Sequence, residues 1–303
     1  MDSVVNADRL ALGTVQWGLP YGIANRTGRP DDAEITRILA TAREAGVRVL
    51  DTARAYGESE AVIGRLVGPD PWWTVVTKLP PLDAPTADGA ELVREAAAHL
   101  DMSRATLRRD TLDIVLLHAP TDRLRSDGAV WRELLRQRDA GTIGALGISA
   151  RSPEEALDAL GDADVTAMQV AFSVLDARLT RAGFFRRADE HGVRLFLRST
   201  YLQGVAHLEL ADLPLHLRPL APTLAAIESW ASAHSLSRAQ AFLLFAREAR
   251  PDTLVLGCET VAQVEDNLRT LSIGAVDGIA EALSAVVPDL PESIVNPARW
   301  PAS

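Results

Sequence analysis

Residues 48–60 read Arg48-Val49-Leu50-Asp51-Thr52-Ala53-Arg54-Ala55-Tyr56-Gly57-Glu58-Ser59-Glu60, which is one complete connection from a strand to a helix. The run from Val47 to Leu50 is typical of a buried strand, and a carboxylate, Asp51, ends it. A loop of small residues then carries Tyr56 before the helix begins. Because a desolvated carboxylate needs a paired cation, an acid at this place indicates function rather than stability. We interpret Asp51 and Tyr56 as two parts of one acid–base site.

The same alternation of an apolar run and an amphipathic segment repeats about eight times along the chain. Strands are predicted at Leu10–Thr14, Val47–Asp51, Trp73–Lys78, Leu112–His118, Ile143–Ile148, Ala167–Val170, Val193–Leu197 and Thr253–Leu256. Helices are predicted at Asp31–Ala45, Ser59–Val67, Ala90–Leu100, Ala129–Ala140, Pro153–Leu160, Phe184–His191, Pro222–Ser232, Ser237–Arg247 and Thr260–Leu268. Strands this apolar are typical of a parallel sheet covered by helices. The pattern predicts an α/β fold, a single (β/α)8 TIM barrel, with residues 1–303 as one domain.

An open doubly wound sheet is the rival architecture. It usually has a Gly-x-Gly-x-x-Gly turn after its first strand. Here the first strand leads into Gly13-Thr14-Val15-Gln16-Trp17-Gly18, which has the wrong spacing. No linker rich in Ser, Gly or Pro divides the chain, so a closed barrel is favoured.

Composition narrows the class of protein. Hydrophobic residues make up 47% of the 303 residues and charged residues 24%, as in ordinary soluble proteins. The net charge of −10 argues against nucleic acid or an anionic membrane as a partner. The sequence shows neither a signal peptide nor an apolar run of about 18 residues. The single cysteine, Cys258, suits a reducing compartment, so we expect a cytoplasmic protein. The sequence gives no indication of the oligomeric state.

Three ionisable residues, Asp51, Lys78 and His118, directly follow consecutive strand-like runs. In parallel barrels the chemistry lies at the carboxyl ends of the strands, where these side chains are expected to meet. A single polar residue at a strand end is often only a solvent-exposed residue without a functional role. Three complementary types in succession, with Tyr56 on the first loop, instead indicate one catalytic site.

The chemistry of these four residues favours carbonyl reduction. Tyrosine is a weak acid, and a nearby lysine ammonium makes Tyr56 a better proton donor to a developing alkoxide. Asp51 can hold Lys78 in place as its ion-pair partner, and His118 can hydrogen-bond the substrate oxygen. Hydride must come from a cofactor, because no side chain supplies it.

The run Asp51-Thr-Ala-Arg-Ala-Tyr56-Gly-Glu-Ser-Glu60-Ala-Val-Ile-Gly64 closely resembles the signature of the aldo-keto reductase family. Thr77-Lys78-Leu79 and Leu116-Leu117-His118 resemble the strands that carry the family's lysine and histidine. The resemblance extends over almost the whole chain and implies a TIM barrel that binds NADP(H) or NAD(H). It implies Tyr56 as general acid, Asp51 and Lys78 as the groups that tune it, and His118 as the group that orients the carbonyl.

The resemblance also implies a set of cofactor-binding residues. Ser149 and Gln169 match positions that hold the carboxamide, although Ala150 replaces the family's asparagine. Arg198 stands where the family usually has an aromatic ring under the nicotinamide. A guanidinium can stack on a flat ring, or it can meet a phosphate or an acidic substrate. The implied cofactor-binding residues are Gly13, Thr14, Asp51, Ser149, Gln169, Arg198, Ser199, Leu202, Gly204, Gly257, Glu259, Gln263 and Asn267.

The segment after the eighth strand departs from members of the family that prefer NADP. Gly257 and Gln263 stand where many of those members have basic residues, and Glu259 adds negative charge nearby. A carboxylate is unfavourable beside a 2′-phosphate and can accept a ribose hydroxyl instead. The helix after Thr260 is expected to offer backbone donors to a phosphate. We expect NAD(H) to be used comparably to NADP(H) or better, with Asn267 at the adenine.

The expected partner is a small carbonyl or sugar-like substrate, contacted by Trp17, Tyr21, Tyr56 and His118. The segment Pro20–Asn25 resembles bacterial members that act on sugars or sugar-derived aldehydes. One alternative is a regulatory barrel that binds the cofactor with little turnover, and another is a redox-assisted sugar epimerase. A metal-dependent isomerase needs more ligands than Asp51 and His118 provide, so no metal site is expected.

Overall fold

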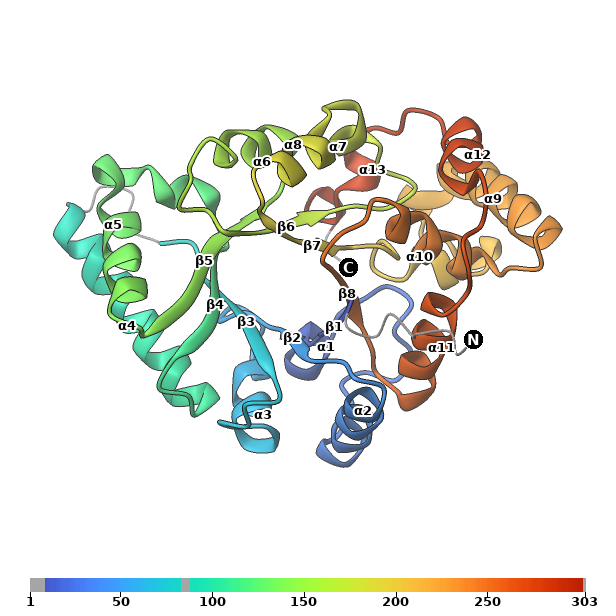
Figure 1. Ribbon diagram of the computed structural model, residues 1–303. Helices are drawn as coiled ribbons and strands as arrows, with labels where there is room; N and C mark the ends of the chain where they lie inside the picture. Colours follow the sequence, from blue (N-terminus) through green and yellow to red (C-terminus); the bar gives the residue numbers. More distant parts are fainter. Residues whose placement is uncertain (1–8, 83–87, 302–303) are drawn as a thin grey trace.

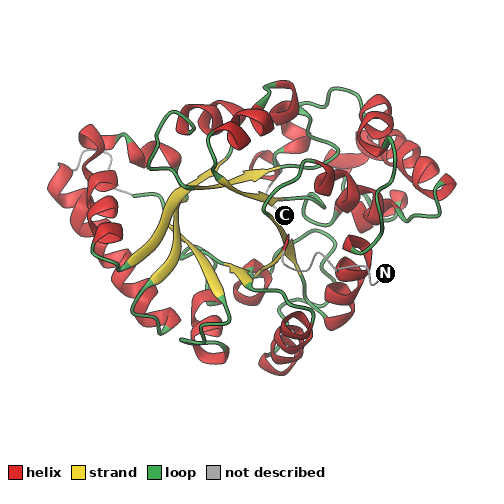
Figure 2. Cartoon of the chain, in the orientation of Figure 1, coloured by secondary structure: helices red, strands yellow, loops and turns green. Residues whose placement is uncertain are grey.

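The computed structural model describes residues 9–82 and 88–301, and its strands form a closed parallel barrel in chain order. Each strand pairs with the next, and the last pairs with the first, where Gly13 lies opposite Gly257. Figures 1 and 2 show the strands at the centre and the helices around them. The strands are β1 (Leu10–Gly13), β2 (Val49–Asp51), β3 (Thr74–Leu79), β4 (Leu112–Leu117), β5 (Ile143–Ala150), β6 (Ala167–Ala171), β7 (Arg194–Arg198) and β8 (Thr253–Gly257). The predicted (β/α)8 TIM barrel is confirmed, while residues 1–8, 83–87 and 302–303 of the predicted domain lie outside the described residues.

Helices fill the connections on the outside of the barrel. The α-helices are α1 (Val15–Gly18), α2 (Asp32–Glu44), α3 (Ser59–Leu66), α4 (Gly89–Leu107), α5 (Arg125–Asp139), α6 (Pro153–Ala159), α7 (Arg178–Arg181), α8 (Phe184–Glu190), α9 (Ala221–Ala233), α10 (Arg238–Glu248), α11 (Val261–Leu271), α12 (Ile279–Val286) and α13 (Glu292–Val295). Short 3-10 helices are η2 (Pro120–Arg123), η3 (Val205–His207), η4 (Leu210–Asp212), η5 (Leu215–Leu220) and η6 (Pro297–Arg299). Within the described residues, no helix combines the length and the apolar character that a membrane crossing requires.

Helix α4 runs to Leu107, seven residues beyond its predicted end at Leu100. The reason is Ser103, which lies buried on the same face as Leu100 and Leu107. Because a serine occupies one position of the helical repeat, the apolar stripe looks interrupted in the sequence although the packed face continues. Helices α1, α7, α12 and α13 were not predicted, since the eightfold alternation does not require them.

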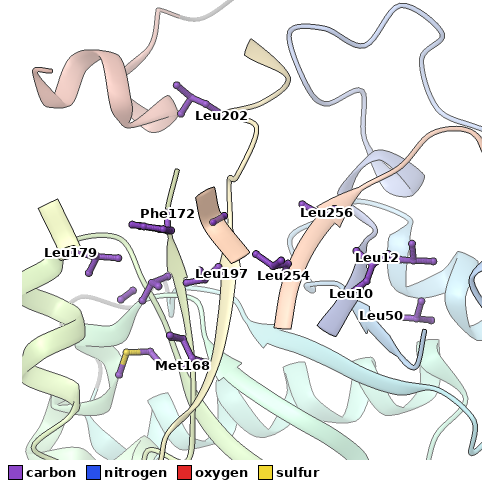
Figure 3. Close-up of a cluster of buried hydrophobic side chains, with 14 of the residues drawn as sticks. Leu10, Leu12, Leu50, Met168, Phe172, Leu179, Leu197, Leu202, Leu254 and Leu256 are labelled. Carbon is purple, nitrogen blue, oxygen red and sulfur yellow. The ribbon is translucent and has the colours of Figure 1, made fainter. Parts of the chain in front are cut away.

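The side chains inside the barrel form a cluster separate from the one beneath the helices. This interior cluster takes alternate strand residues, as expected where successive side chains point to opposite faces. Its members are Ala11, Val49, Val76, Ile114, Leu116, Ala167, Phe196 and Val255, with Ala145 packed against them. The residues between them point outward. Figure 3 shows outward leucines such as Leu10, Leu12, Leu50 and Leu254, which belong to the larger core under the helices.

Candidate active site

The candidate site is the last inward-facing layer of the barrel, at the carboxyl ends of the strands. Counting in steps of two from the interior cluster, each strand contributes one residue there. On β2, for example, Val49 lies in the interior cluster and Asp51 lies above it. The layer consists of Gly13, Asp51, Lys78, His118, Ser149, Gln169, Arg198 and Gly257. The twofold repeat of the strands therefore brings together predicted residues that are far apart in the sequence.

Asp51 is the centre of a buried hydrogen-bond network. The Lys78 ammonium donates to Asp51 Oδ1 at 2.8 Å and to the Thr52 carbonyl oxygen at 2.8 Å. The Gln169 amide also donates to Asp51 Oδ1, at 2.7 Å, and Ser149 lies 3.3 Å from the Gln169 amide oxygen. Both charged side chains are almost fully buried, at 0% exposure for Lys78 and 5% for Asp51. Such a pair persists because its donors and acceptors are satisfied inside the protein.

The loop that carries Tyr56 is fixed from below by hydroxyl groups. Thr14 Oγ1 donates to the Asp51 carbonyl oxygen at 2.9 Å, and Ser59 Oγ donates to the Thr14 carbonyl oxygen at 2.9 Å. Close packing adds to this, because a Cβ at Gly18 would lie 1.8 Å from the Tyr56 carbonyl oxygen. The glycine therefore lets the first βα loop touch the second, and the contact fixes the Tyr56 backbone.

Tyr56, Lys78 and His118 converge above this network. The Lys78 ammonium lies over the Tyr56 ring, 5.0 Å from its centroid, and the His118 ring meets Tyr56 edge-on with centroids 6.0 Å apart. Burial, together with the positive charges of Lys78, Arg198 and Arg151, lowers the pKa of His118 to about 4. His118 is therefore neutral at physiological pH and can donate or accept one hydrogen bond at each nitrogen. The four predicted catalytic residues do lie together.

A cavity of about 410 Å³ opens onto this cluster, and we call it the catalytic cavity. Predicted residues that line it are Gly13, Thr14, Tyr21, Asp51, Tyr56, His118, Arg198, Ser199 and Gly257. Four residues from the C-terminal part of the chain, 295–298, complete the wall. They follow α13, which lies nearer the barrel axis than α12 in Figure 1.

A second cavity of about 290 Å³ adjoins the first, and we call it the distal cavity. Its predicted lining residues are Ser199, Gly204, Gly257, Glu259, Gln263 and Asn267, and Asp266 also lines it. The two cavities share the residues Gln16, Ser199, Gln203, Val255 and Gly257. The Asn267 amide is held by two neighbours, since Tyr201 donates to it at 2.6 Å and it donates to Cys258 Sγ at 3.4 Å.

The two joined cavities fit an elongated ligand such as a dinucleotide lying along the barrel edge. Three buried polar atoms in their walls make no hydrogen bond to the described residues: Gln16 Oε1, Thr200 Oγ1 and His118 Nδ1. Buried polar atoms are normally paired, so groups of this kind are suited to receive a bound ligand. Gln16 and Thr200 face the distal cavity and His118 faces the catalytic cavity.

Several predicted residues lie away from the cavities. Trp17 is 1% exposed, lines neither cavity, and donates to the Cys258 carbonyl oxygen at 3.3 Å, so its expected substrate contact is replaced by a packing role. Leu202 is likewise buried in the core under the loops. Ser149 and Gln169 are absent from both linings because their amide and hydroxyl groups already face each other and Asp51.

The start of α11 also differs from the expectation. The Val261 N–H donates to a Glu34 carboxylate oxygen at 2.9 Å, and the Gln263 N–H donates to Thr260 Oγ1 at 3.3 Å. Because these backbone donors are already used, the predicted phosphate-binding helix terminus is largely capped by the protein itself. The Gln263 side chain in turn donates to Glu259 at 3.0 Å.

Sequence reasoning missed part of the catalytic cavity. Arg151, Arg178 and Gln203 line it, as do residues 295–298. Arg151 follows the observed β5, which runs to Ala150, two residues beyond the predicted strand end at Ile148, so the strand-end rule that selected Asp51 and Lys78 did not select it. Arg178 and the C-terminal residues reach the cavity from outside the strand ends, so no local pattern marks them.

Known proteins place this arrangement in a class. The sequence profile described as the aldo/keto reductase family matches residues 9–282. The chain therefore belongs to the aldo/keto reductase family, an assignment that supports NAD(P)-dependent carbonyl reduction. Cys258 shows no sign of separate redox chemistry, since burial raises the pKa of its thiol to about 12.

Among curated relatives, the chain is 31% identical over 155 residues to the 6-dehydroglucose reductase of Novosphingobium aromaticivorans, which covers 46% of this chain and 48% of that protein. It is 27% identical over 184 residues to the 2,5-diketo-D-gluconic acid reductase B of a Corynebacterium species, which covers 58% and 62%. The chain thus spans less than two thirds of the length of these relatives. These alignments agree with the family assignment.

Solved structures agree on the fold. An aldo-keto reductase from Bacillus halodurans in its holo form superposes with a TM-score of 0.74 at 18% identity, covering 93% of both chains. The glycerol dehydrogenase of Gluconobacter oxydans superposes with a TM-score of 0.70 at 20% identity, covering 97% of this chain and 94% of the other. At such identities the likeness describes the barrel alone.

Proposed function

We propose that this protein reduces an aldehyde or ketone to an alcohol, or catalyses the reverse reaction, with Tyr56 as the general acid and base. The observation that carries the proposal is that Tyr56 and His118 line one cavity while the buried Lys78 ammonium lies against the Tyr56 ring. The Lys78 ammonium lies 5.0 Å from the Tyr56 ring centroid and is fixed by its 2.8 Å bond to Asp51. This arrangement keeps a positive charge beside the phenol without exposing it to water.

Proton transfer follows from that arrangement. As charge develops on the substrate oxygen, Tyr56 donates its hydroxyl proton to it, and the Lys78 ammonium stabilises the phenolate that remains. Asp51 accepts a hydrogen bond from the Lys78 ammonium at 2.8 Å and stays the partner of the lysine. His118 is neutral because burial holds the pKa of its imidazole at about 4, and it directs a hydrogen bond to the substrate oxygen. A bound nicotinamide supplies the hydride.

The residues proposed to hold the cofactor run from one cavity into the other. Ser199, Gln16 and Gly257 lie in the wall that the cavities share, and Asn267 lies at the distal end. Thr200 adds a buried hydroxyl that has no partner among the described residues. Gln169 and Ser149, which bond to the Asp51 network, act in this proposal by keeping Asp51 and Lys78 in register.

We further propose that NAD(H) is bound at least as well as NADP(H). Glu259 and Asp266 line the distal cavity, and no lysine or arginine among the described residues does so. The position that many NADP-preferring members fill with a basic residue is Gly257, and a Cβ there would lie 2.3 Å from the Gln16 amide. The structure therefore offers a 2′-phosphate two carboxylates and no cation.

The substrate is proposed to be a sugar-derived carbonyl compound. Support comes from the names of two relatives, a 6-dehydroglucose reductase and a 2,5-diketo-D-gluconic acid reductase. The wall of the catalytic cavity includes the polar side chains of Tyr21, Gln16 and Gln203. Such side chains suit a substrate that carries hydroxyl groups.

Oxidation of NADH and NADPH with a panel of aldoses, keto sugars and aromatic aldehydes tests the proposal. We expect turnover of at least one sugar-derived carbonyl, with kcat/KM for NADH equal to or above that for NADPH. Tight binding of cofactor without turnover of any compound would favour the regulatory barrel instead. A roughly hundredfold preference for NADPH would contradict the cofactor assignment while leaving the reductase assignment in place.

A further inference from the structure

Three guanidinium groups line the catalytic cavity. Arg198 ends β7, Arg151 follows β5 directly, and Arg178 begins α7. They come from three connections, yet they face one space that also contains Tyr56 and His118. The charges of Arg198 and Arg151 both reach His118, because each helps to lower the pKa of its imidazole. The reaction centre therefore lies within their electrostatic reach.

The three arginines differ in how they are paired. Arg178 makes a two-pronged ion pair with Asp176, at 2.8 and 2.7 Å, and lies 3.5 Å from Glu292. Arg151 lies 3.1 Å from Glu155. Arg198 has no ion-pair partner among the described residues. It donates to the Ala150 carbonyl oxygen and to Ser199 Oγ, both at 3.2 Å. These bonds use two of its five N–H donors.

The carboxylates that pair with Arg151 and Arg178 stand behind the cavity rather than in it. Glu155, Asp176 and Glu292 are absent from its lining, and within the described residues Asp51 is the single carboxylate that lines it. Asp51 is already bonded to the Lys78 ammonium. The cavity therefore presents more positive than negative charge, although the chain as a whole carries a net charge of −10.

We propose that the substrate carries an anionic group, a carboxylate or a phosphate ester, and that Arg198 binds it with Arg151 and Arg178 on either side. This inference rests on the proposed function, because it names the chemical class of the compound reduced at Tyr56. A guanidinium presents a planar set of donors that matches the two oxygens of a carboxylate or phosphate. Arg198 is half-buried and keeps N–H donors that make no hydrogen bond to the described residues, so it can bind an anion in the cavity.

The position of Arg198 separates this role from binding of the cofactor's phosphates. Its neighbours Ser199 and Thr200 line the distal cavity, whereas Arg198 lines only the catalytic cavity. Its charge also acts on Tyr21, which lies in the same cavity wall. Arg198 is therefore on the substrate side of the shared wall.

Paired substrates test the inference. Succinic semialdehyde is compared with butanal, and D-glyceraldehyde 3-phosphate with D-glyceraldehyde. We expect kcat/KM to be roughly 10- to 100-fold higher for the anionic member of at least one pair. Preference within the first pair identifies a carboxylate, and preference within the second identifies a phosphate ester. Calorimetric titration of the NADH-bound protein with succinate and with inorganic phosphate gives a readout without turnover.

The Arg198→Gln variant is expected to lose most of that preference by raising KM for the anionic substrate, with a small change for the neutral one. Arg198→Lys should recover part of it, and Arg194→Gln, at the opposite end of β7, is the matched control. Equal kcat/KM within both pairs, without binding of either anion, would overturn the inference while the reductase assignment stands. An Arg198→Gln variant that weakens NADH binding and slows neutral and anionic substrates alike would also overturn it, since it would place Arg198 at the cofactor.

Discussion

The catalytic and distal cavities share a wall, yet opposite charges surround them. Arg151, Arg178 and Arg198 line the first, whereas Glu259 and Asp266 line the second. Both lie at the carboxyl edge of the same barrel and take residues from β8 and from the connections that follow β1 and β7. Under the proposed function, this difference lets one edge of the barrel select two ligands by opposite charges.

The two cavities also differ in how their polar groups are fixed. Beneath the catalytic cavity a buried ion pair of Lys78 and Asp51 is braced by Gln169. In the distal cavity Glu259 is half-buried and Asp266 is exposed, and Gln263 and Glu259 simply bond to each other. Chemistry requires fixed charges, because a misplaced proton donor is ineffective. Binding of an adenosine tolerates polar groups that are held less rigidly.

Removal of the Tyr56 hydroxyl is expected to have the largest effect, and it tests whether the cavities work separately. Tyr56→Phe should lower kcat by roughly 10²–10⁴-fold, since the proton donor is lost. The dissociation constant for NADH, measured by fluorescence, should stay nearly unchanged because Tyr56 does not line the distal cavity. A variant with unchanged kcat would refute the role of Tyr56. A large loss of NADH affinity would show that the two cavities are coupled.

Breaking the buried ion pair should affect stability next most strongly. Lys78→Met leaves the Asp51 carboxylate buried at 5% exposure without its cation, so we expect a loss of about 3–5 kcal/mol of unfolding free energy. Urea denaturation measures it.

The control for this measurement is Arg65→Met, which removes an ion pair to Asp32 with both side chains about half exposed. Its cost should be much smaller, because solvent screens an exposed ion pair. The double variant Lys78→Met/Asp51→Asn should recover part of the loss, because the uncompensated charge is gone. Equal losses of unfolding free energy for the buried and the exposed pair would contradict the view that burial makes the pair of Lys78 and Asp51 important for stability.

The barrel and the catalytic cluster could be predicted because both are local features of the sequence. A short apolar run marks each strand in the sequence, and Asp51, Lys78 and His118 lie directly after such runs. Because inward positions repeat every second residue, the strand ends already specify which side chains meet.

The rest depends on contacts that join distant parts of the chain. Trp17 was expected at the substrate, but it bonds to Cys258, 241 residues away. The start of α11 is capped by Glu34, 227 residues before Val261, and no local pattern reveals this. Arg178 and residues 295–298 likewise reach the catalytic cavity through tertiary packing. Neither periodicity nor spacing carries that information.

The acidic wall of the distal cavity can be tested by neutralising it. Glu259→Gln should raise the affinity for NADPH relative to NADH by roughly tenfold, because one carboxylate near the 2′-phosphate is removed. The dissociation constants of both reduced cofactors measure this. Glu265→Gln, on the helix α11 that follows Glu259 but outside both cavities, is the matched control. If the ratio of the two dissociation constants is unchanged in Glu259→Gln, this carboxylate does not distinguish the two cofactors at the ribose.

The smallest expected effect concerns His118, and it tests whether the positive charge of the catalytic cavity reaches the reaction centre. Its pKa is lowered to about 4 by burial and by Lys78, Arg198 and Arg151, from the usual value of about 6.5. The neutral ring therefore stabilises the folded protein above pH 6.5, and that contribution is lost as the pH falls from 6.5 towards 4. Between pH 7 and pH 5 the unfolding free energy of the wild type should fall by more than that of His118→Gln, because over this range the ring takes up a proton in the unfolded state but not in the folded one. His191→Gln removes an exposed histidine and should behave like the wild type.

The pH profile of kcat/KM gives a second test of His118. It should show no limb with a midpoint near pH 6.5. A limb at that pH would mean that His118 titrates as it does in water and that the arginines lie too far away to act on it.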